Sequence, residues 1–363
     1  MMKYKVTCFA IMIVTFYLLS AILPASAQLP FPDVPPTHWA YQAVTDLKAK
    51  GILLGYPAES SPSTKSKKVV YSLACSSSEA EAQQTEPTRV QDVIYGRKPG
   101  VALTMDVFKP SKPNGIAVLY MVSGGWVSSH EAVNPGLAKL FTDRGETVFE
   151  IVHGSQPKYT IPEIVQDIQR AVRFIRTHAA EYGVDPNRIG ITGASSGGHL
   201  SLSIGALGVD GLPNAPDPVD RASSAVQAVA CFFPPTDFLN YGKEGVNALK
   251  VDILKPFWPA FGTGDATSAE ERERVARLDS PIYAVTAKMP PTLIIHGDAD
   301  TLVPLQQSQF FMAKLEALKV PHQLEIRPGK GHGWPEMGSD IHLLAEWFEK
   351  YLSKSDKDVQ VKF

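Results

Sequence analysis

The stretch Arg188-Ile189-Gly190-Ile191-Thr192-Gly193-Ala194-Ser195-Ser196-Gly197-Gly198-His199-Leu200 decides the fold. Its first five residues, Arg188–Thr192, are a predicted strand. Glycine-x-serine-x-glycine follows, centred on Ser195, a pattern typical of a tight strand-to-helix turn that exposes the serine hydroxyl. Small neighbours relieve the crowding in such a turn, and the following helix directs its positive end toward it. The stretch therefore predicts Ser195 as a nucleophile.

Short apolar runs alternate with longer segments of helical periodicity from Val90 onward. That alternation predicts an α/β fold with a mostly parallel central sheet and helices on both faces. Apolar residues recur at helical spacing from Ile164 to Ile175 and again at Phe310, Leu315 and Leu318. The expected strands are Leu103–Phe108, Ile116–Val122, Thr147–Val152, Arg188–Thr192, Val226–Phe233, Thr292–His296 and Gln323–Arg327.

The same turn also resembles the glycine-rich turn of short-chain dehydrogenases, in which backbone amides bind a pyrophosphate. Against that alternative, His199 replaces the last glycine of the dinucleotide pattern, the motif lies past the middle of the chain, and no Tyr-x-x-x-Lys occurs. A nucleophilic serine is therefore favoured. Ser196 is the other candidate, but only Ser195 has a glycine two places away on each side.

A serine hydroxyl becomes an effective nucleophile when a histidine takes its proton and a carboxylate orients that histidine. Asp298 and Asp300 follow the apolar run that ends at Ile295, and His332 lies among glycines after the next predicted strand, Gln323–Arg327. Both loops follow the C-terminal end of a strand, where open α/β sheets place their sites. His332 is the predicted base, because the other histidines precede a strand, lie in a helix or are explained by packing or surface positions.

From about Asp92 to Leu352 the chain resembles the lipase and esterase branch of the α/β hydrolases. The closest likeness is to feruloyl and acetyl-xylan esterases that carry H-G-G-G-W and G-x-S-A-G-G-H-L. Asp300 matches the second aspartate of the superfamily's G-D-x-D-x-x-V-P pattern, so the resemblance implies a triad of Ser195, Asp300 and His332. Asp298 is expected to brace the turn.

An oxyanion hole is expected beside the nucleophile, because acyl transfer develops negative charge on the carbonyl oxygen. One donor should be the backbone amide of Ser196. The resemblance implies that Gly124 and Gly125 supply the others, from the loop Val122-Ser123-Gly124-Gly125-Trp126. This loop begins with valine and serine where the family has histidine and glycine.

Residues 234–288 form an insertion before the strand that precedes the predicted triad acid. Its aromatic residues Phe257 and Trp258, together with Trp126, are candidates to line a substrate pocket over Ser195. The alternative is that these rings only pack the insertion onto the core. Neither metal-ligand spacing nor a phosphate-binding loop occurs in the sequence, so we expect no metal and no other cofactor.

Residues 1–27 have the pattern of a signal peptide. Lys3 and Lys5 precede an apolar stretch from Val6 to Leu23, and the triplet Ala25-Ser26-Ala27 resembles a cleavage site. The alternative is an uncleaved membrane anchor, because the apolar stretch is long enough to span a bilayer. We expect removal, and so a secreted or cell-envelope bacterial protein without a stable membrane span.

Residues 28–57 resemble the opening half of an S-layer homology module, a family of helical repeats that attach bacterial exoproteins to cell-wall polysaccharide. The resemblance rests on the segment from Phe31 to Tyr41 and on Gly55-Tyr56-Pro57. It implies cell-wall polysaccharide as a partner of residues 30–57, the alternative being a merely structural helix. Residues 58–88, rich in Ser, Glu, Gln and Thr, are a predicted linker. Residues 89–354 are the predicted catalytic domain, and 355–363 a C-terminal tail.

The whole chain of 363 residues is 44% hydrophobic and 20% charged, the balance of a globular protein. Its net charge of -2 and the lack of a long block of like charge exclude nucleic acid as a partner. The predicted function is hydrolysis of small-molecule or polysaccharide-linked carboxylic esters, such as acetyl or feruloyl esters of plant polysaccharide, through an acyl-enzyme. The alternatives are a prolyl-oligopeptidase-like peptidase and a non-catalytic hydrolase-fold protein that binds the cell wall.

Overall fold

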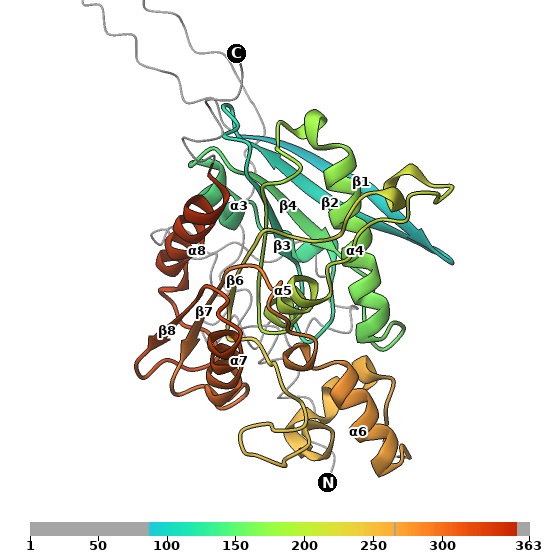
Figure 1. Cartoon of the computed structure of the whole chain (residues 1–363), viewed down its shortest axis with the longest axis vertical. Helices are drawn as coiled ribbons and strands as arrows, with labels where there is room; N and C mark the ends of the chain where they lie inside the picture. Colours follow the sequence, from blue (N-terminus) through green and yellow to red (C-terminus); the bar gives the residue numbers. More distant parts are fainter. Residues whose placement is uncertain (1–86, 265, 354–363) are drawn as a thin grey trace, which may run out of the picture. The chain divides into compact units, whose positions relative to one another are not determined.

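The computed structural model describes residues 87–264 and 266–353. Their framework is an eight-stranded sheet in the order β1-β2-β4-β3-β5-β6-β7-β8 (Figure 1). β1 and β2 form an antiparallel pair at one edge, β2 is also antiparallel to β4, and all later neighbours are parallel. The strands are β1 (Thr88–Lys98), β2 (Val101–Lys109), β3 (Ala117–Met121), β4 (Thr147–Val152), β5 (Ile189–Ala194), β6 (Ala228–Phe232), β7 (Thr292–Gly297) and β8 (His322–Arg327).

Helices cover both faces of this sheet. α3 (Pro135–Thr142) and α8 (Met337–Leu352) pack on one face, whereas α4 (Ile161–Thr177), α5 (Ser196–Leu207) and α7 (Gln306–Ala317) bury their apolar side chains with the other face. The predicted α/β architecture with a mostly parallel sheet is confirmed. The remaining helices are η2 (His130–Ala132), η3 (Ala179–Tyr182), η4 (Pro218–Arg221), η5 (Ala248–Lys250), η6 (Asp252–Phe261), α6 (Ala269–Leu278) and η7 (Pro281–Tyr283).

The central strands are buried on both faces, which explains why they were readable in the sequence. In β3 every residue is buried, with Leu119 in the core beneath α4 and α5 and Val118 in the core beneath α3 and α8. Such strands appear as continuous apolar runs. All of the predicted strands are confirmed, and the helical spacing from Ile164 to Ile175 lies in α4 as buried positions.

The structure differs from the sequence-based prediction at one strand and in the register of one helix. β1 was not predicted, because it is an edge strand whose side chains are largely exposed, with Tyr95 its one buried residue. It begins at Thr88, a residue assigned to the linker. The helical spacing that included Phe310 was also wrong in register: Phe310 is 39% exposed and its neighbour Phe311 is fully buried. Phe311 precedes Leu315 by four residues and therefore lies on the same face of the helix, whereas Phe310 precedes it by five.

Between β6 and β7 the insertion folds into short helices, η5 to η7 together with α6, drawn in yellow and orange in Figure 1. Its side chains Leu254, Trp258 and Phe261 join the larger hydrophobic core. No helix among the described residues is both long and apolar enough to cross a membrane. The predicted signal peptide, the S-layer-like segment and the C-terminal tail lie outside the described residues.

The core also contains ionisable groups whose pKa values differ from the usual ones. Burial raises the pKa of Glu146, Glu150 and Asp279 to about 8. Burial likewise disfavours the charged form of histidine, and it therefore lowers the pKa of His153 and His199 to about 4. The folded protein therefore holds these carboxyl groups protonated and these imidazoles neutral at pH values where the unfolded chain does neither.

We expect the stability of the protein to fall as pH rises from 6.5 to 8. Over this window the two buried histidines are neutral in the folded protein and lose their remaining protons in the unfolded chain. The three buried carboxyl groups are ionised in the unfolded chain and still largely protonated in the folded protein, and this larger difference lowers stability as pH rises. Glu150→Gln removes one such proton, so its melting temperature should fall less steeply over this window than that of the wild type. Glu316→Gln, at an exposed position, is the control, and an unchanged slope for Glu150→Gln would contradict the assignment.

Candidate active site

Ser195 sits on a strained turn between β5 and α5. Its backbone adopts φ 56° and ψ -120°, a left-handed conformation that residues with a side chain rarely adopt. Two backbone hydrogen bonds hold the turn, from the Ser195 amide to the Phe232 carbonyl at 3.0 Å and from the His199 amide to the Ser195 carbonyl at 2.9 Å. A β-carbon at Gly193 would lie 2.6 Å from the carbonyl carbon of Gly197. The spacing of the two glycines is thus a steric requirement of the turn.

The predicted acid and base meet at this serine. Nε2 of His332 lies 3.0 Å from Oγ of Ser195, and Nδ1 of His332 lies 2.7 Å from Oδ2 of Asp300. The three side chains come from the loops after β5, β7 and β8. The Asp300 side chain is fully buried, whereas that of His332 is 22% exposed. This arrangement allows Ser195 to pass its proton to an imidazole whose other nitrogen faces a carboxylate.

Asp300 is held as an anion by its hydrogen bonds. Burial raises the pKa of its carboxyl group, but hydrogen bonds to His296 and His332 lower it by more, so that this pKa lies well below the usual range. Oδ1 also accepts from the backbone amides of Leu302 and Val303, at 2.9 Å each. Because the carboxylate is both ionised and fixed, it favours the tautomer of His332 that donates from Nδ1.

Asp298 braces the two loops that carry the acid and the base. Its Oδ1 accepts a hydrogen bond from the Gly329 amide at 2.6 Å, and the Ala299 amide donates to the Lys330 carbonyl at 2.9 Å. The loops approach so closely that a β-carbon at Gly297 would lie 2.2 Å from the Lys330 carbonyl oxygen. The distance from Asp300 to His332 thus depends on contacts between the loop that follows β7 and the loop that follows β8.

One predicted oxyanion donor is not available. The amide of Gly124 donates to the carbonyl of Val127 at 2.9 Å, within a small bridge of the loop, and Gly124 is exposed. Its assignment to the oxyanion hole is therefore corrected, because the sequence could not reveal this bond inside the loop. Gly125 and Ser196 do line the pocket beside Ser195. They remain the candidate donors.

Side chains that the sequence did not single out hold the loop that carries Gly125. Nε2 of Gln156 donates to the Gly125 carbonyl at 2.8 Å, and the Gln156 amide donates to the Trp126 carbonyl at 3.1 Å. Oγ of Ser123 lies 3.1 Å from Oγ of Ser196. Gly125 and Trp126 both have positive φ values, 57° and 61°. The contacts therefore stabilise a loop conformation that is otherwise unfavourable for tryptophan.

His199 completes this support from α5. Nε2 of His199 donates to the Asp279 carbonyl at 2.7 Å, which leaves Nδ1 to accept a hydrogen bond from Nε1 of Trp126 at 3.2 Å. Burial lowers the pKa of His199 to about 4, so the imidazole is neutral and can accept at ordinary pH. The sequence explained His199 only as a packing or surface residue, because nothing near it in the chain indicates either partner.

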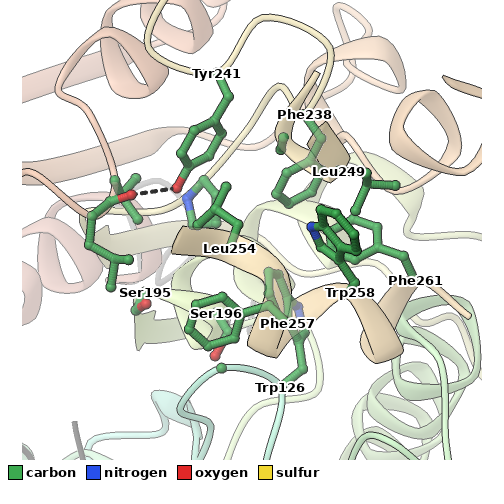
Figure 2. Close-up of a pocket in the computed structure, with 15 residues that line it drawn as sticks. Trp126, Ser195, Ser196, Phe238, Tyr241, Leu249, Leu254, Phe257, Trp258 and Phe261 are labelled. Carbon is green, nitrogen blue, oxygen red and sulfur yellow. Dashed lines mark hydrogen bonds between the residues drawn. The ribbon is translucent and has the colours of Figure 1, made fainter. Parts of the chain in front are cut away.

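An apolar pocket lies beside Ser195 (Figure 2). The predicted pocket residues Trp126, Phe257 and Trp258 all line it. The insertion and the loop after β6 supply most of the other walls. These are formed by Pro235, Phe238, Tyr241, Ala248, Leu249, Leu254 and Phe261.

A second cluster has the residue types of a metal site. Among the described residues, one nitrogen or oxygen atom from each of Asp92, Asp106 and His130 lies within 4.8 Å of the other two. Asp106 already forms an ion pair with Arg89 at 2.5 Å. None of these residues lines the pocket beside Ser195, so the cluster is not part of the candidate active site.

Comparison with known families agrees with this fold. The BD-FAE family matches residues 105–315, more than half of the chain, and the chain belongs to this family. Its fold is that of the α/β-hydrolase esterases. The S-layer homology domain matches residues 30–60. Both resemblances read from the sequence are confirmed.

Individual relatives are esterases. The probable carboxylic ester hydrolase LipM and the esterase LipC, both of Mycobacterium tuberculosis, are each 29% identical to the chain over 68% and 70% of its length. These matches cover 57% of LipM and 63% of LipC, so the chain spans about three fifths of these curated relatives. A solved structure, a truncated form of a carbohydrate esterase from gut microbiota, is 27% identical with a TM-score of 0.64 and matches over 75% of this chain and 99% of its own.

We expect Gln156→Leu to lower kcat for a p-nitrophenyl ester by about tenfold. Loss of one oxyanion donor typically costs ~3 kcal/mol, and a loop whose Gly125 amide is only misaligned should cost less. Gln169→Leu is the matched control, since Nε2 of Gln169 donates to the Leu207 carbonyl at 3.0 Å on the surface. Equal rates for the two variants would show that Gln156 does not position the loop.

Proposed function

We propose that the protein is a serine carboxylesterase in which Ser195 is the nucleophile, His332 the base and Asp300 the residue that orients His332. The observation that carries the proposal is the continuous pair of hydrogen bonds from Ser195 through His332 to Asp300, at 3.0 and 2.7 Å. A left-handed turn, a buried carboxylate and an adjoining apolar pocket support it.

The first half-reaction forms an acyl-enzyme. Oγ of Ser195 attacks the ester carbonyl carbon while Nε2 of His332 takes the hydroxyl proton. The carbonyl oxygen becomes an oxyanion, and the amides of Gly125 and Ser196 stabilise it. The tetrahedral intermediate then collapses, the bond to the alcohol oxygen breaks, and His332 returns the proton to that oxygen.

The second half-reaction releases the acid. Water replaces the alcohol beside His332, which takes a proton from the water as its oxygen attacks the acyl carbon. The same amides hold the second oxyanion. Collapse of this intermediate returns the proton to Ser195, and Asp300 stays ionised throughout because the pKa of its carboxyl is lowered in the folded protein.

We infer that the ester belongs to a carbohydrate, with acetyl or feruloyl groups on plant polysaccharide as the leading candidates. The solved relative that is 27% identical is described as a carbohydrate esterase. Membership of the BD-FAE family supports the same class of substrate. A secreted or cell-envelope location suits a polymeric substrate, and the match of residues 30–60 to the S-layer homology domain supports attachment to the cell wall.

Ser195→Ala should abolish hydrolysis of p-nitrophenyl acetate by the purified protein, because the acyl-enzyme cannot form. A loss of at least about 10³-fold in kcat is expected. Ser196→Ala is the comparison, since the Ser196 hydroxyl contacts Oγ of Ser123 and is not hydrogen-bonded to His332. It should lower kcat far less than Ser195→Ala, because the backbone amide of Ser196 is retained. Hydrolysis that survives Ser195→Ala would refute the assignment of the nucleophile. Inactivity of the wild type on every ester would favour a non-catalytic role.

Cell-wall attachment is tested with the mature chain and the same chain lacking residues 28–57. We expect the longer form to sediment with peptidoglycan that carries its wall polysaccharide, and the shorter form to remain in solution. Both forms should hydrolyse p-nitrophenyl acetate at equal rates, which controls for folding. Equal binding by the two forms would remove the proposed partner of this segment.

A further inference from the structure

One polar atom in the wall of the pocket has no hydrogen-bond partner. Trp258 is 5% exposed, and its Nε1 atom is buried without a partner in the described structure. An indole N–H can only donate, and it usually finds an acceptor when it is buried. A buried donor without an acceptor is unfavourable, because it has lost its hydrogen bonds to water.

The other aromatic donors of the pocket wall are satisfied. The Tyr241 hydroxyl donates to the Leu302 carbonyl at 2.8 Å, the contact drawn as a dashed line in Figure 2. Nε1 of Trp126 donates to His199 at 3.2 Å. Trp258 therefore differs from Tyr241 and Trp126, the two similar residues of the pocket wall, because its N–H has no acceptor.

Trp258 is held in place from outside the pocket. The guanidinium carbon of Arg272 lies 4.5 Å from the centroid of the indole ring, and Arg272 also donates to the carbonyls of Leu249 and Gly264. The Trp258 carbonyl accepts hydrogen bonds from Thr263. A fixed ring keeps its N–H direction fixed, which is what selective recognition of an acceptor requires.

Figure 2 places Ser195 and Trp258 on opposite sides of the pocket, with the indole nitrogen on the side of the ring that faces Leu254. The residues between them, Leu254 and Phe257 among others, are apolar. A group that extends from Ser195 toward Trp258 thus meets apolar walls first and a hydrogen-bond donor at its far end.

The acyl half of the ester is the part that fits this pocket. His332 must protonate the leaving alcohol, so the alcohol lies on the His332 side of Ser195. The pocket is lined by Ser195, Ser196 and Gly125, and His332 does not belong to its walls. The acyl group stays bonded to Ser195 while the alcohol leaves and water enters past the partly exposed His332.

We propose that Trp258 is a specificity-determining residue, whose N–H selects acyl groups that are apolar along their length and carry an uncharged oxygen acceptor at the far end. This inference rests on the proposed esterase function. An ether, carbonyl or hydroxyl oxygen meets the requirement, whereas a carboxylate would lose its hydration in an apolar pocket. Acyl groups of equal length without the oxygen leave the N–H unsatisfied and bind less well.

The test uses two series of p-nitrophenyl esters of increasing acyl length, one of plain hydrocarbons and one with a terminal methyl ketone. For each length the ratio of kcat/KM between the two series is compared in wild type and in Trp258→Phe, so that intrinsic differences in ester reactivity cancel. At one length the wild-type ratio should exceed that of Trp258→Phe by about tenfold, the effect of one hydrogen bond. The same ratio at every length in both proteins would overturn the proposal.

Trp347→Phe is the matched control, since Nε1 of Trp347 donates to the Pro291 carbonyl at 3.3 Å on the far side of the core. Its ratios should equal those of the wild type. A binding measurement removes the dependence on catalysis and on the folding of Trp258→Phe. The Ser195→Ala protein, titrated calorimetrically with intact esters of both series, should bind the keto ester of the selected length more tightly than its hydrocarbon counterpart.

Equal affinities at all lengths would refute the role of Trp258 even if the esterase is active. Conversely, a wild type that binds the keto esters selectively but hydrolyses none of them would refute the proposed function and leave the recognition by Trp258 standing. The two failures are therefore distinguishable.

Discussion

The left-handed turn at Ser195 is the constraint on which the rest of the site depends. It exists because Gly193 and Gly197 can approach each other within a distance that leaves no room for a side chain. Backbone hydrogen bonds to Phe232 and His199 fix the serine at the C-terminal end of the parallel strands. Every other group of the site is arranged around that fixed hydroxyl: the imidazole from the loop after β8, the carboxylate from the loop after β7 and the glycine loop after β3.

Much of this could be predicted from the sequence, for physical reasons that differ between elements. Buried parallel strands appear as apolar runs, so the strand before Asp300 could be predicted from its buried residues, and Ser195 was predicted from its glycine-x-serine-x-glycine motif. His332 follows the edge strand β8, which has no buried residue, and was predicted from the alternating segment before it and the glycines around it. β1 was missed because its residues are largely exposed and show neither an apolar run nor a regular alternation. Gly124 was misassigned because its amide bonds to Val127 inside the same loop, a matter of conformation that residue types do not reveal.

The contacts that hold the loop of Gly125 and Trp126 could not be predicted from the sequence, for another reason. Gln156 lies in the segment between β4 and α4, and His199 lies in α5. Their side chains reach Gly125 and Trp126 only when the chain is folded. These contacts explain how a loop that begins with valine and serine, in place of the family's histidine and glycine, still places Gly125 beside Ser195. Trp126 links this loop to the pocket, since it forms part of the loop and also lines the pocket. A change in the conformation of the loop would therefore also move one wall of the pocket.

The most direct test of the central claim is to identify the atom that becomes acylated or phosphonylated. The wild-type protein is treated with a fluorophosphonate, digested, and mapped by tandem mass spectrometry. The account predicts a single phosphonyl adduct on Ser195, because among the described residues it is the Ser195 hydroxyl that is hydrogen-bonded to His332, at 3.0 Å. An adduct on Ser196 or elsewhere, or no adduct at all, would contradict it.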